Sequence, residues 1–135
     1  MKCQDVMTAN PVCCLPDDTV GQAARIMRRE HAGWVPVVSD EWRRKLVGII
    51  TNRDLAMKVV AESRDFNRTV VSDVMTKIMI ACRAEDDLMS AAKAMEEHQV
   101  RRIPILDREN HLVGIVSQTD TPRVMNHSIT LSRAA

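Results

Sequence analysis

Most of this sequence consists of two copies of one repeat. The phrase "DVMT" stands at residues 5–8 and again at 73–76, and "WVPVV" at 34–38 corresponds to "RIPIL" at 102–106. After an insertion of two residues in the first copy, "GIITNRD" at 48–54 corresponds to "GIVSQTD" at 114–120. A duplication that covers nearly all of a 135-residue chain restricts the fold to one supersecondary unit built twice.

Each copy predicts the order strand, helix, strand, strand, helix. In the first copy "PVCCL" (11–15) favours a strand, residues 20, 23, 24 and 27 share one helical face, and "NRDLAMKVVAE" (52–62) resumes a helical pattern. The β-branched runs at 34–39 and 44–51, joined by a polar turn, predict a hairpin. The fold class is therefore α+β, with two βαββα repeats. Because a repeat of about 60 residues buries little core alone, we expect the two to pack face to face.

The repeat also sets the expected domain organisation. We expect a first repeat over 1–62, a connector over 63–72, a second repeat over 73–126, and a disordered C-terminal tail over 127–135. The stretch 61–72 contains no Gly or Pro, which argues against a floppy linker. Acidic residues are expected to cap the first helix of each copy: Asp17 and Asp18, then Glu85, Asp86 and Asp87.

Composition narrows the class of protein. The formal net charge of +1 provides no field that would attract nucleic acid. No apolar run approaches the roughly 20 residues that span a bilayer, and the N-terminus lacks the apolar stretch of a signal peptide, so we expect a cytoplasmic protein without a membrane partner. With two Trp, one Phe and no Tyr, the core must consist of aliphatic side chains and Met.

Neither a metal site nor a catalytic centre is predicted. The four cysteines show no C-x-x-C spacing, and the four histidines show no ligand spacing. Cys14 and Cys82 are expected in the core, while a reactive or metal-binding role for the pair Cys13–Cys14 is the alternative. No P-loop and no nucleophile–base pair accompanies the repeated aspartates, which argues against an enzyme.

The repeated phrase ends in a hydroxyl residue and, three positions later, an aspartate: Thr51 with Asp54, and Ser117 with Asp120. One interpretation is a capping box at the start of a helix, although that motif usually has Glu or Gln at the second position. The other is a binding site, in which free N–H groups and the hydroxyl bind phosphate and the carboxylate accepts hydrogen bonds from a diol. Both interpretations remain open from these residues alone.

Two further residue types recur beside this phrase. Pro36 and Pro104 lie inside predicted strands, where proline is confined to edges or bulges and leaves backbone groups available to a planar heterocycle such as adenine. Gly48 and Gly114 interrupt the next strand, which indicates close approach of a ligand or of another backbone, or tight packing of helix on sheet.

The ordered set of motifs "DVMT", "VPVV"/"IPIL" and "GIITNRD"/"GIVSQTD" resembles a tandem pair of cystathionine-β-synthase-type (CBS) domains, often called a Bateman module. The resemblance covers about residues 1–126. It implies two βαββα repeats about a pseudo-twofold axis, with clefts that bind adenosine-containing ligands: AMP, ADP, ATP, or alternatively NAD or S-adenosylmethionine. It also implies a homodimer in the form of a flat disc and an effector protein on a separate chain.

By position, the resemblance implies a set of binding residues. The aspartates would hold the ribose hydroxyls, the hydroxyl residues would contact ribose or phosphate, the residues of the proline strands would line the adenine slots, and two arginines would bind phosphate. These residues are Thr51, Asp54, Ser117, Asp120, Val35, Pro36, Ile103, Pro104, Arg101 and Arg102.

Two departures make the repeats unequal. The first copy has Gly33 and Trp34 where the second has two arginines, and Trp34 would either stack on a base or fill the cleft. In the second copy Pro122 stands where the last helix should already be running, so that helix either starts late or is kinked. We therefore expect the better carboxylate geometry at Asp54.

The function predicted from the sequence is a non-catalytic sensor that binds an adenine nucleotide and signals to a partner. A structural dimerisation module with vestigial clefts is the alternative, favoured by Trp34 and Pro122.

Overall fold

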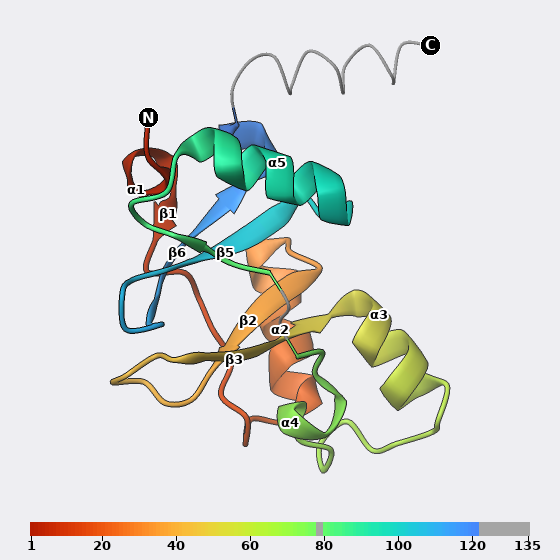
Figure 1. The fold of residues 1–135 in the computed structure, drawn as a ribbon. Helices are drawn as coiled ribbons and strands as arrows, with labels where there is room; N and C mark the ends of the chain where they lie inside the picture. Colours follow the sequence, from red (N-terminus) through yellow and green to blue (C-terminus); the bar gives the residue numbers. More distant parts are fainter. Residues whose placement is uncertain (78–79, 122–135) are drawn as a thin grey trace, which may run out of the picture. The chain divides into compact units, whose positions relative to one another are not determined.

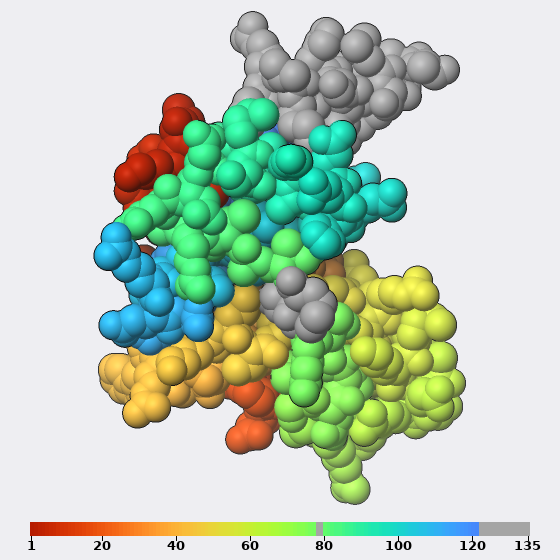
Figure 2. All heavy atoms as spheres, viewed as in Figure 1, coloured from red at the N-terminus to blue at the C-terminus, as the bar shows by residue number. Residues whose placement is uncertain are grey.

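The computed structural model describes residues 1–77 and 80–121, and the chain divides into two compact units (Figure 1). The first-repeat unit comprises Val12–Met79. The second-repeat unit combines Met1–Pro11 with the chain from Ile80 onward. Figure 2 shows the atoms of the first residues, in red, against those that follow residue 80, in green to blue. The beginning of the chain therefore folds with the second repeat.

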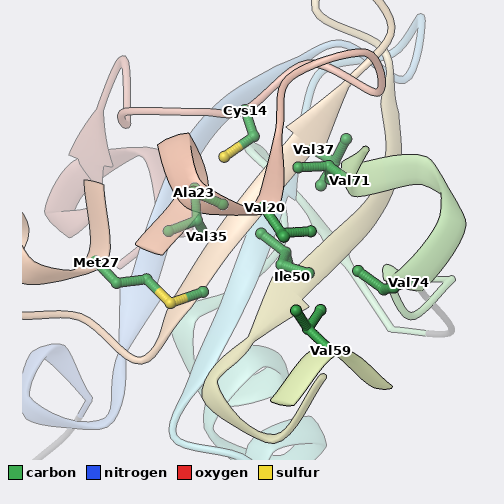
Figure 3. Close-up of a cluster of buried hydrophobic side chains, with 10 residues drawn as sticks. All are labelled: Cys14, Val20, Ala23, Met27, Val35, Val37, Ile50, Val59, Val71 and Val74. Carbon is green, nitrogen blue, oxygen red and sulfur yellow. The ribbon is translucent and has the colours of Figure 1, made fainter. Parts of the chain in front are cut away.

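The first-repeat unit packs helices against a hairpin. Helix α2 (Val20–Glu30) is followed by β2 (Trp34–Val38) and β3 (Leu46–Thr51), which pair antiparallel with Pro36 opposite Ile49. After β3 the chain turns into α3 (Asn52–Leu55), continues as a π-helical turn η1 (Ala56–Val60) and later forms α4 (Val71–Val74). The core of this unit is aliphatic with two sulfur-containing side chains, Cys14 and Met27 (Figure 3).

The second-repeat unit has the same plan. It begins with α1 (Cys3–Val6) and β1 (Thr8–Ala9) and resumes with β4 (Cys82–Arg83), α5 (Leu88–His98), β5 (Arg102–Leu106) and β6 (Leu112–Ser117). A 3-10 turn, η2 (Gln118–Asp120), follows. The strands form one sheet in the order β1-β6-β5-β4, in which β4 is parallel to β5 and the other pairs are antiparallel. This mixed architecture confirms the α+β class.

Isolated β-bridges in the first-repeat unit correspond to strand pairs in the second-repeat unit. Cys14 pairs in parallel with Val37 of β2, as β4 pairs with β5. Thr76 pairs antiparallel with Ile49 of β3, as β1 pairs with β6. Each hairpin is thus flanked on both sides by a two-residue strand or a single bridge, and one of these flanking segments begins at the threonine of "DVMT".

The two strand glycines are explained by these flanking segments. A Cβ built on Gly48 would lie 2.8 Å from Met75 Sδ and 2.9 Å from Thr76 O. A Cβ on Gly114 would collide with the Met7 side chain and lie 3.0 Å from Thr8 O. Of the three interpretations of these glycines, the close approach of another backbone is the one that the structure supports.

Several boundaries differ from the sequence-based expectation. The predicted strand at 11–15 is reduced to the bridge at Cys14, and its counterpart is the two-residue β4. Helix α2 is capped by Thr19, whose Oγ1 accepts a hydrogen bond from Gln22 N at 3.2 Å, and not by Asp17 or Asp18. The carboxylate of Asp18 instead accepts a hydrogen bond from Leu15 N at 2.8 Å, in the preceding turn. In the second copy Asp87 is the cap, as predicted.

The connector is held against helix α2. Val20 N donates to Thr69 O at 2.9 Å, and Gly21 N donates to Phe66 O at 3.0 Å. These bonds satisfy N–H groups of the first helical turn, which have no partner within the helix. The expectation that this stretch is no floppy linker agrees with these bonds. The expected tail at 127–135 and the end of the second repeat lie outside the described residues. None of the helices in the described ranges combines the length and apolar character needed to cross a bilayer.

Candidate functional site

Asp54 lies in the first turn after β3, where the capping interpretation holds. Thr51 Oγ1 accepts a hydrogen bond from Asp54 N at 3.1 Å, and Asp54 Oδ2 accepts one from Thr51 N at 3.0 Å. Thr51 Oγ1 also lies 3.0 Å from Asp54 Oδ2. Because the extended backbone of Thr51 brings the two groups close, aspartate is long enough to complete a reciprocal capping box here.

The second oxygen of Asp54 is bound by two residues that sequence reasoning missed. Thr76 Oγ1 donates to Asp54 Oδ1 at 2.9 Å, and Lys58 Nζ lies 2.9 Å from the same oxygen. Asp54 is only 4% exposed, so its charge is compensated within the protein by these groups. Both residues could have been suspected from the sequence. Lys58 follows Asp54 by four residues in a helical pattern, a spacing that favours an ion pair, and Thr76 ends the repeated "DVMT".

Asp120 has a different environment. Its Oδ2 accepts hydrogen bonds from Ser117 N at 2.9 Å and from Ser117 Oγ at 3.0 Å, so the reciprocal contact recurs. Within residues 1–77 and 80–121 no hydrogen bond or ion pair is formed by Asp120 Oδ1, and the residue is half-buried. The turn ends at Thr121, whose backbone is extended (φ −80°, ψ 163°). An extended residue is what a following proline imposes, and Pro122 is next in the chain.

The predicted adenine-slot residues are buried within the hairpins. Val35 belongs to the core of the first-repeat unit and Ile103 to that of the second-repeat unit. Pro36 and Pro104 are buried as well. The carbonyl of Pro36 accepts a hydrogen bond from Cys14 N at 2.9 Å, so this strand is not an open edge at that position. The predicted residues of the proline strands are thus apolar and buried, and the Pro36 carbonyl already accepts a hydrogen bond.

In each unit, a residue just before the proline strand is hydrogen-bonded to the turn that follows the next strand. Asn52 N donates to Gly33 O at 2.9 Å, and Gln118 N donates to Arg101 O at 2.8 Å. Arg101 is exposed, and Arg102 and Trp34 are half-buried. The backbone of these residues therefore lies directly beside the turn that carries the aspartate.

Among the described residues, two hollows that lie within single units are lined by none of the predicted site residues. One, of about 400 Å³, lies in the first-repeat unit between α2 and α3 and includes Gly33, Asn52 and Leu55. The other, of about 670 Å³, lies in the second-repeat unit among charged residues such as Arg83, Asp86 and Arg108. We place the candidate site by the chemistry of the repeated phrase, because the larger hollow's arginines are already paired with Asp107 O and Glu85.

The cysteines lie in the cores of the units or close to them. Cys3, Cys14 and Cys82 are buried, and none of the four cysteines forms a disulfide with another described residue. Burial raises the pKa of Cys14 to about 12, with smaller contributions from Asp18 and Cys13. Burial likewise raises the pKa of Cys13, against the opposing effect of Arg44, whose Nη2 lies 3.2 Å from its Sγ. Among the described residues, no group of three or more His, Cys, Asp or Glu side chains is placed to hold a metal ion.

A model of the CBS domain matches residues 3–61 and 71–121. The CBS domain-containing protein YhcV of Bacillus subtilis is 37% identical over 117 residues, which are 87% of this chain and 80% of that protein. The crystal structure of Hypoxic Response Protein I with two coordinated zinc ions has a TM-score of 0.79 at 31% identity, covering 89% of this chain and 95% of that one.

A further crystal structure, CBSX2 in complex with AMP, has a TM-score of 0.74 at 25% identity and covers 97% of this chain and 98% of that one. The family model accounts for both copies of the repeat, and the solved structures reproduce the fold over most of their length. This protein belongs to the CBS domain family and carries two CBS domains in tandem.

Proposed function

We propose that this protein is a non-catalytic regulatory module that binds an adenosine-containing ligand and signals to a separate partner protein. The ligand class is AMP, ADP or ATP, with NAD or S-adenosylmethionine as the alternative. The proposal rests on one observation above all: a hydroxyl residue and a carboxylate meet at the same strand-to-helix turn in both repeats. The AMP complex of the CBS protein CBSX2 supports the choice of ligand class.

The proposed binding residues keep the roles suggested by their chemistry. Asp120 and Asp54 are hydrogen-bond acceptors for ribose hydroxyls, and Ser117 and Thr51 are neighbouring polar contacts. Arg101 and Arg102 are donors for phosphate oxygens, which guanidinium groups bind through paired hydrogen bonds. Val35, Pro36, Ile103 and Pro104 supply the apolar surface for the base.

The regulatory role requires that the ligand bind one state of the protein more tightly than another. Only that difference in affinity shifts an equilibrium between states. We propose that the states differ in the relative arrangement of the repeats, in a cytoplasmic homodimer of the disc type, and that the partner protein responds to this arrangement.

Thermal-shift measurements with AMP, ADP, ATP, NAD and S-adenosylmethionine test the proposal. A ligand at a hundred times its dissociation constant stabilises the folded state by about 2.7 kcal/mol. The wild type is expected to gain thermal stability with one ligand class, and Asp120→Ala is expected to lose that gain. Absence of a shift with all five compounds would contradict ligand sensing and favour a structural dimerisation module.

A further inference from the structure

We propose that the two repeated aspartates have different functions: Asp120 receives the ligand, while Lys58 and Thr76 occupy Asp54 as an internal lock. This inference rests on the proposed function and specifies how its two sites are regulated. A ligand at Asp54 must first displace groups of the protein itself, whereas a ligand at Asp120 need not.

The number of acceptor positions distinguishes the two carboxylates. An ionised carboxylate offers about four lone-pair sites for hydrogen bonds. At Asp54 all four are taken: Thr51 N and Thr51 Oγ1 bind Oδ2, and Thr76 Oγ1 and Lys58 Nζ bind Oδ1. At Asp120 the bonds of the described residues all go to Oδ2 and come from Ser117. Within residues 1–77 and 80–121, the other oxygen of Asp120 is therefore available to a diol.

The lock has no counterpart in the second repeat among the described residues. Thr8 matches Thr76 in the repeated "DVMT", yet it is exposed and its hydroxyl forms no hydrogen bond with Asp120. The residue that matches Lys58 in the repeat is Val124, which carries neither charge nor donor. Among the described residues the sites therefore differ by one repositioned hydroxyl, and the repeat in the sequence adds one substituted side chain.

Both groups that bind Asp54 Oδ1 are linked to residues 74–76: Thr76 belongs to this segment, and Lys58 is hydrogen-bonded to it. Lys58 Nζ also donates to Val74 O at 3.0 Å, so the ammonium group joins Asp54 to the end of α4. Thr76 exchanges two backbone hydrogen bonds of 2.8 Å with Ile49 of β3. Displacing Lys58 and Thr76 thus weakens the attachment of residues 74–76, which lead along the chain into the second repeat. Occupation of Asp54 would loosen this segment, whereas occupation of Asp120 would not.

Hydrogen exchange without ligand tests the lock by itself. In the double variant Lys58→Met/Thr76→Val, the amides of residues 74–76 are expected to exchange about tenfold faster than in the wild type, the factor associated with losing a charge-assisted hydrogen bond. Asp54→Asn should give the same acceleration, and the matched control Asp120→Asn should leave these amides at the wild-type rate. Unchanged exchange in both lock variants would overturn the lock.

Calorimetric titration with AMP tests the assignment of the two sites. The wild type is expected to show one strong binding event per chain, which Asp120→Asn abolishes, whereas Asp54→Asn is expected to change only a second, weaker event. The double variant Lys58→Met/Thr76→Val should gain a second event at least about tenfold tighter than any second event of the wild type, because no internal donor competes. A purely structural role of Lys58 would not add a binding event.

Three results would overturn the assignment. They are two equal events in the wild type, loss of the strong event in a folded Asp54→Asn variant, and weaker AMP binding without a new event in the double variant. The last would make Lys58 a phosphate contact. If AMP does not bind the wild type at all, the proposed function and the role of Asp120 fail together, while hydrogen exchange still decides the lock.

Discussion

At the scale of single residues, Asp54 shows how a buried charge is tolerated. A carboxylate removed from water is costly unless hydrogen bonds or an opposite charge compensate it, and Asp54 has both. The side chain of Lys58 is 46% exposed, so its ion pair is partly screened, and the hydrogen bonds from Thr51 and Thr76 provide the more dependable compensation. Asp54 is thus both the acidic partner of Thr51 in a capping box and an acceptor for Thr76 and Lys58.

The strand glycines make a direct prediction. Gly48→Ala is expected to destabilise the fold by about 1–3 kcal/mol, because the new Cβ meets Thr76 O at 2.9 Å, and that carbonyl is fixed by its hydrogen bond from Ile49 N. Urea denaturation measures the change. The matched control is Gly33→Ala, where the nearest atoms all belong to the end of the exposed Asn52 side chain, which has room to shift. Equal stability of the two variants would contradict this account.

The buried thiols predict a loss of stability in alkali. Burial raises the pKa of Cys14 from its ordinary 9.0 to about 12 and that of Cys3 to about 11. The folded state therefore keeps these protons while the unfolded chain loses them, so their contribution is complete below pH 9 and declines as the pH rises above it. Each thiol adds a slope of about −1.4 kcal/mol per pH unit in that range.

Urea denaturation between pH 8 and 11 checks this dependence. The variant Cys14→Ala removes one titrating group, so its stability should fall less steeply with pH than that of the wild type. Parallel pH profiles for the two proteins would show that ionisation of Cys14 is not linked to unfolding.

At the scale of helices and strands, prediction from sequence succeeded where periodicity and pairing patterns are strong. Helix α2 and the hairpin of β2 and β3 lie where the apolar face at residues 20–27 and the β-branched runs indicate. The short helices α1 and α4 were missed, because four residues carry too little periodicity to identify them. The pairing of Thr76 with Ile49 was missed because a two-residue contact leaves no pattern that a sequence alone reveals.

The cap of α2 is testable at this scale. Thr19 Oγ1 accepts from Gln22 N at 3.2 Å, and Gln22 Oε1 accepts from Thr19 N at 2.8 Å, a complete capping box. Thr19→Ala should cost about 0.5–2 kcal/mol in thermal or urea denaturation, because the Gln22 N–H then loses its acceptor. Thr19→Ser keeps the hydroxyl and should remain close to the wild type; a loss as large as that of Thr19→Ala would indicate that the cap is not the cause.

At the scale of the whole molecule, the main surprise is where the ends of the repeats fold. The duplication in the sequence suggests two consecutive blocks, yet residues 1–11 pack with the chain after residue 80. Cys3 is fully buried in the core of that unit, and β1 forms an edge of its sheet next to β6. A repeat in the sequence shows which segments are duplicated. It does not show with which repeat a flanking segment folds, because both copies of that segment have the same pattern.

Deletion of residues 1–11 therefore has a specific expected effect. It removes β1 from β6 and opens the core at Cys3, so amides of residues 112–117 should exchange faster with solvent in hydrogen-exchange measurements. Gln4→Ala is the matched control, because Gln4 is exposed and its backbone bond to Ala84 O does not need the side chain. Unchanged protection of 112–117 after the deletion would contradict the described pairing.

The placement of the first eleven residues bears on how the protein is made. On a ribosome, the unit that spans Val12–Met79 has all its residues soon after the middle of the chain emerges, and domains generally fold in that order. Residues 1–11 can pair with β6 only after β6 has been synthesised. Residues 1–11 are therefore ordered only after the chain that lies between them and β6 has been made.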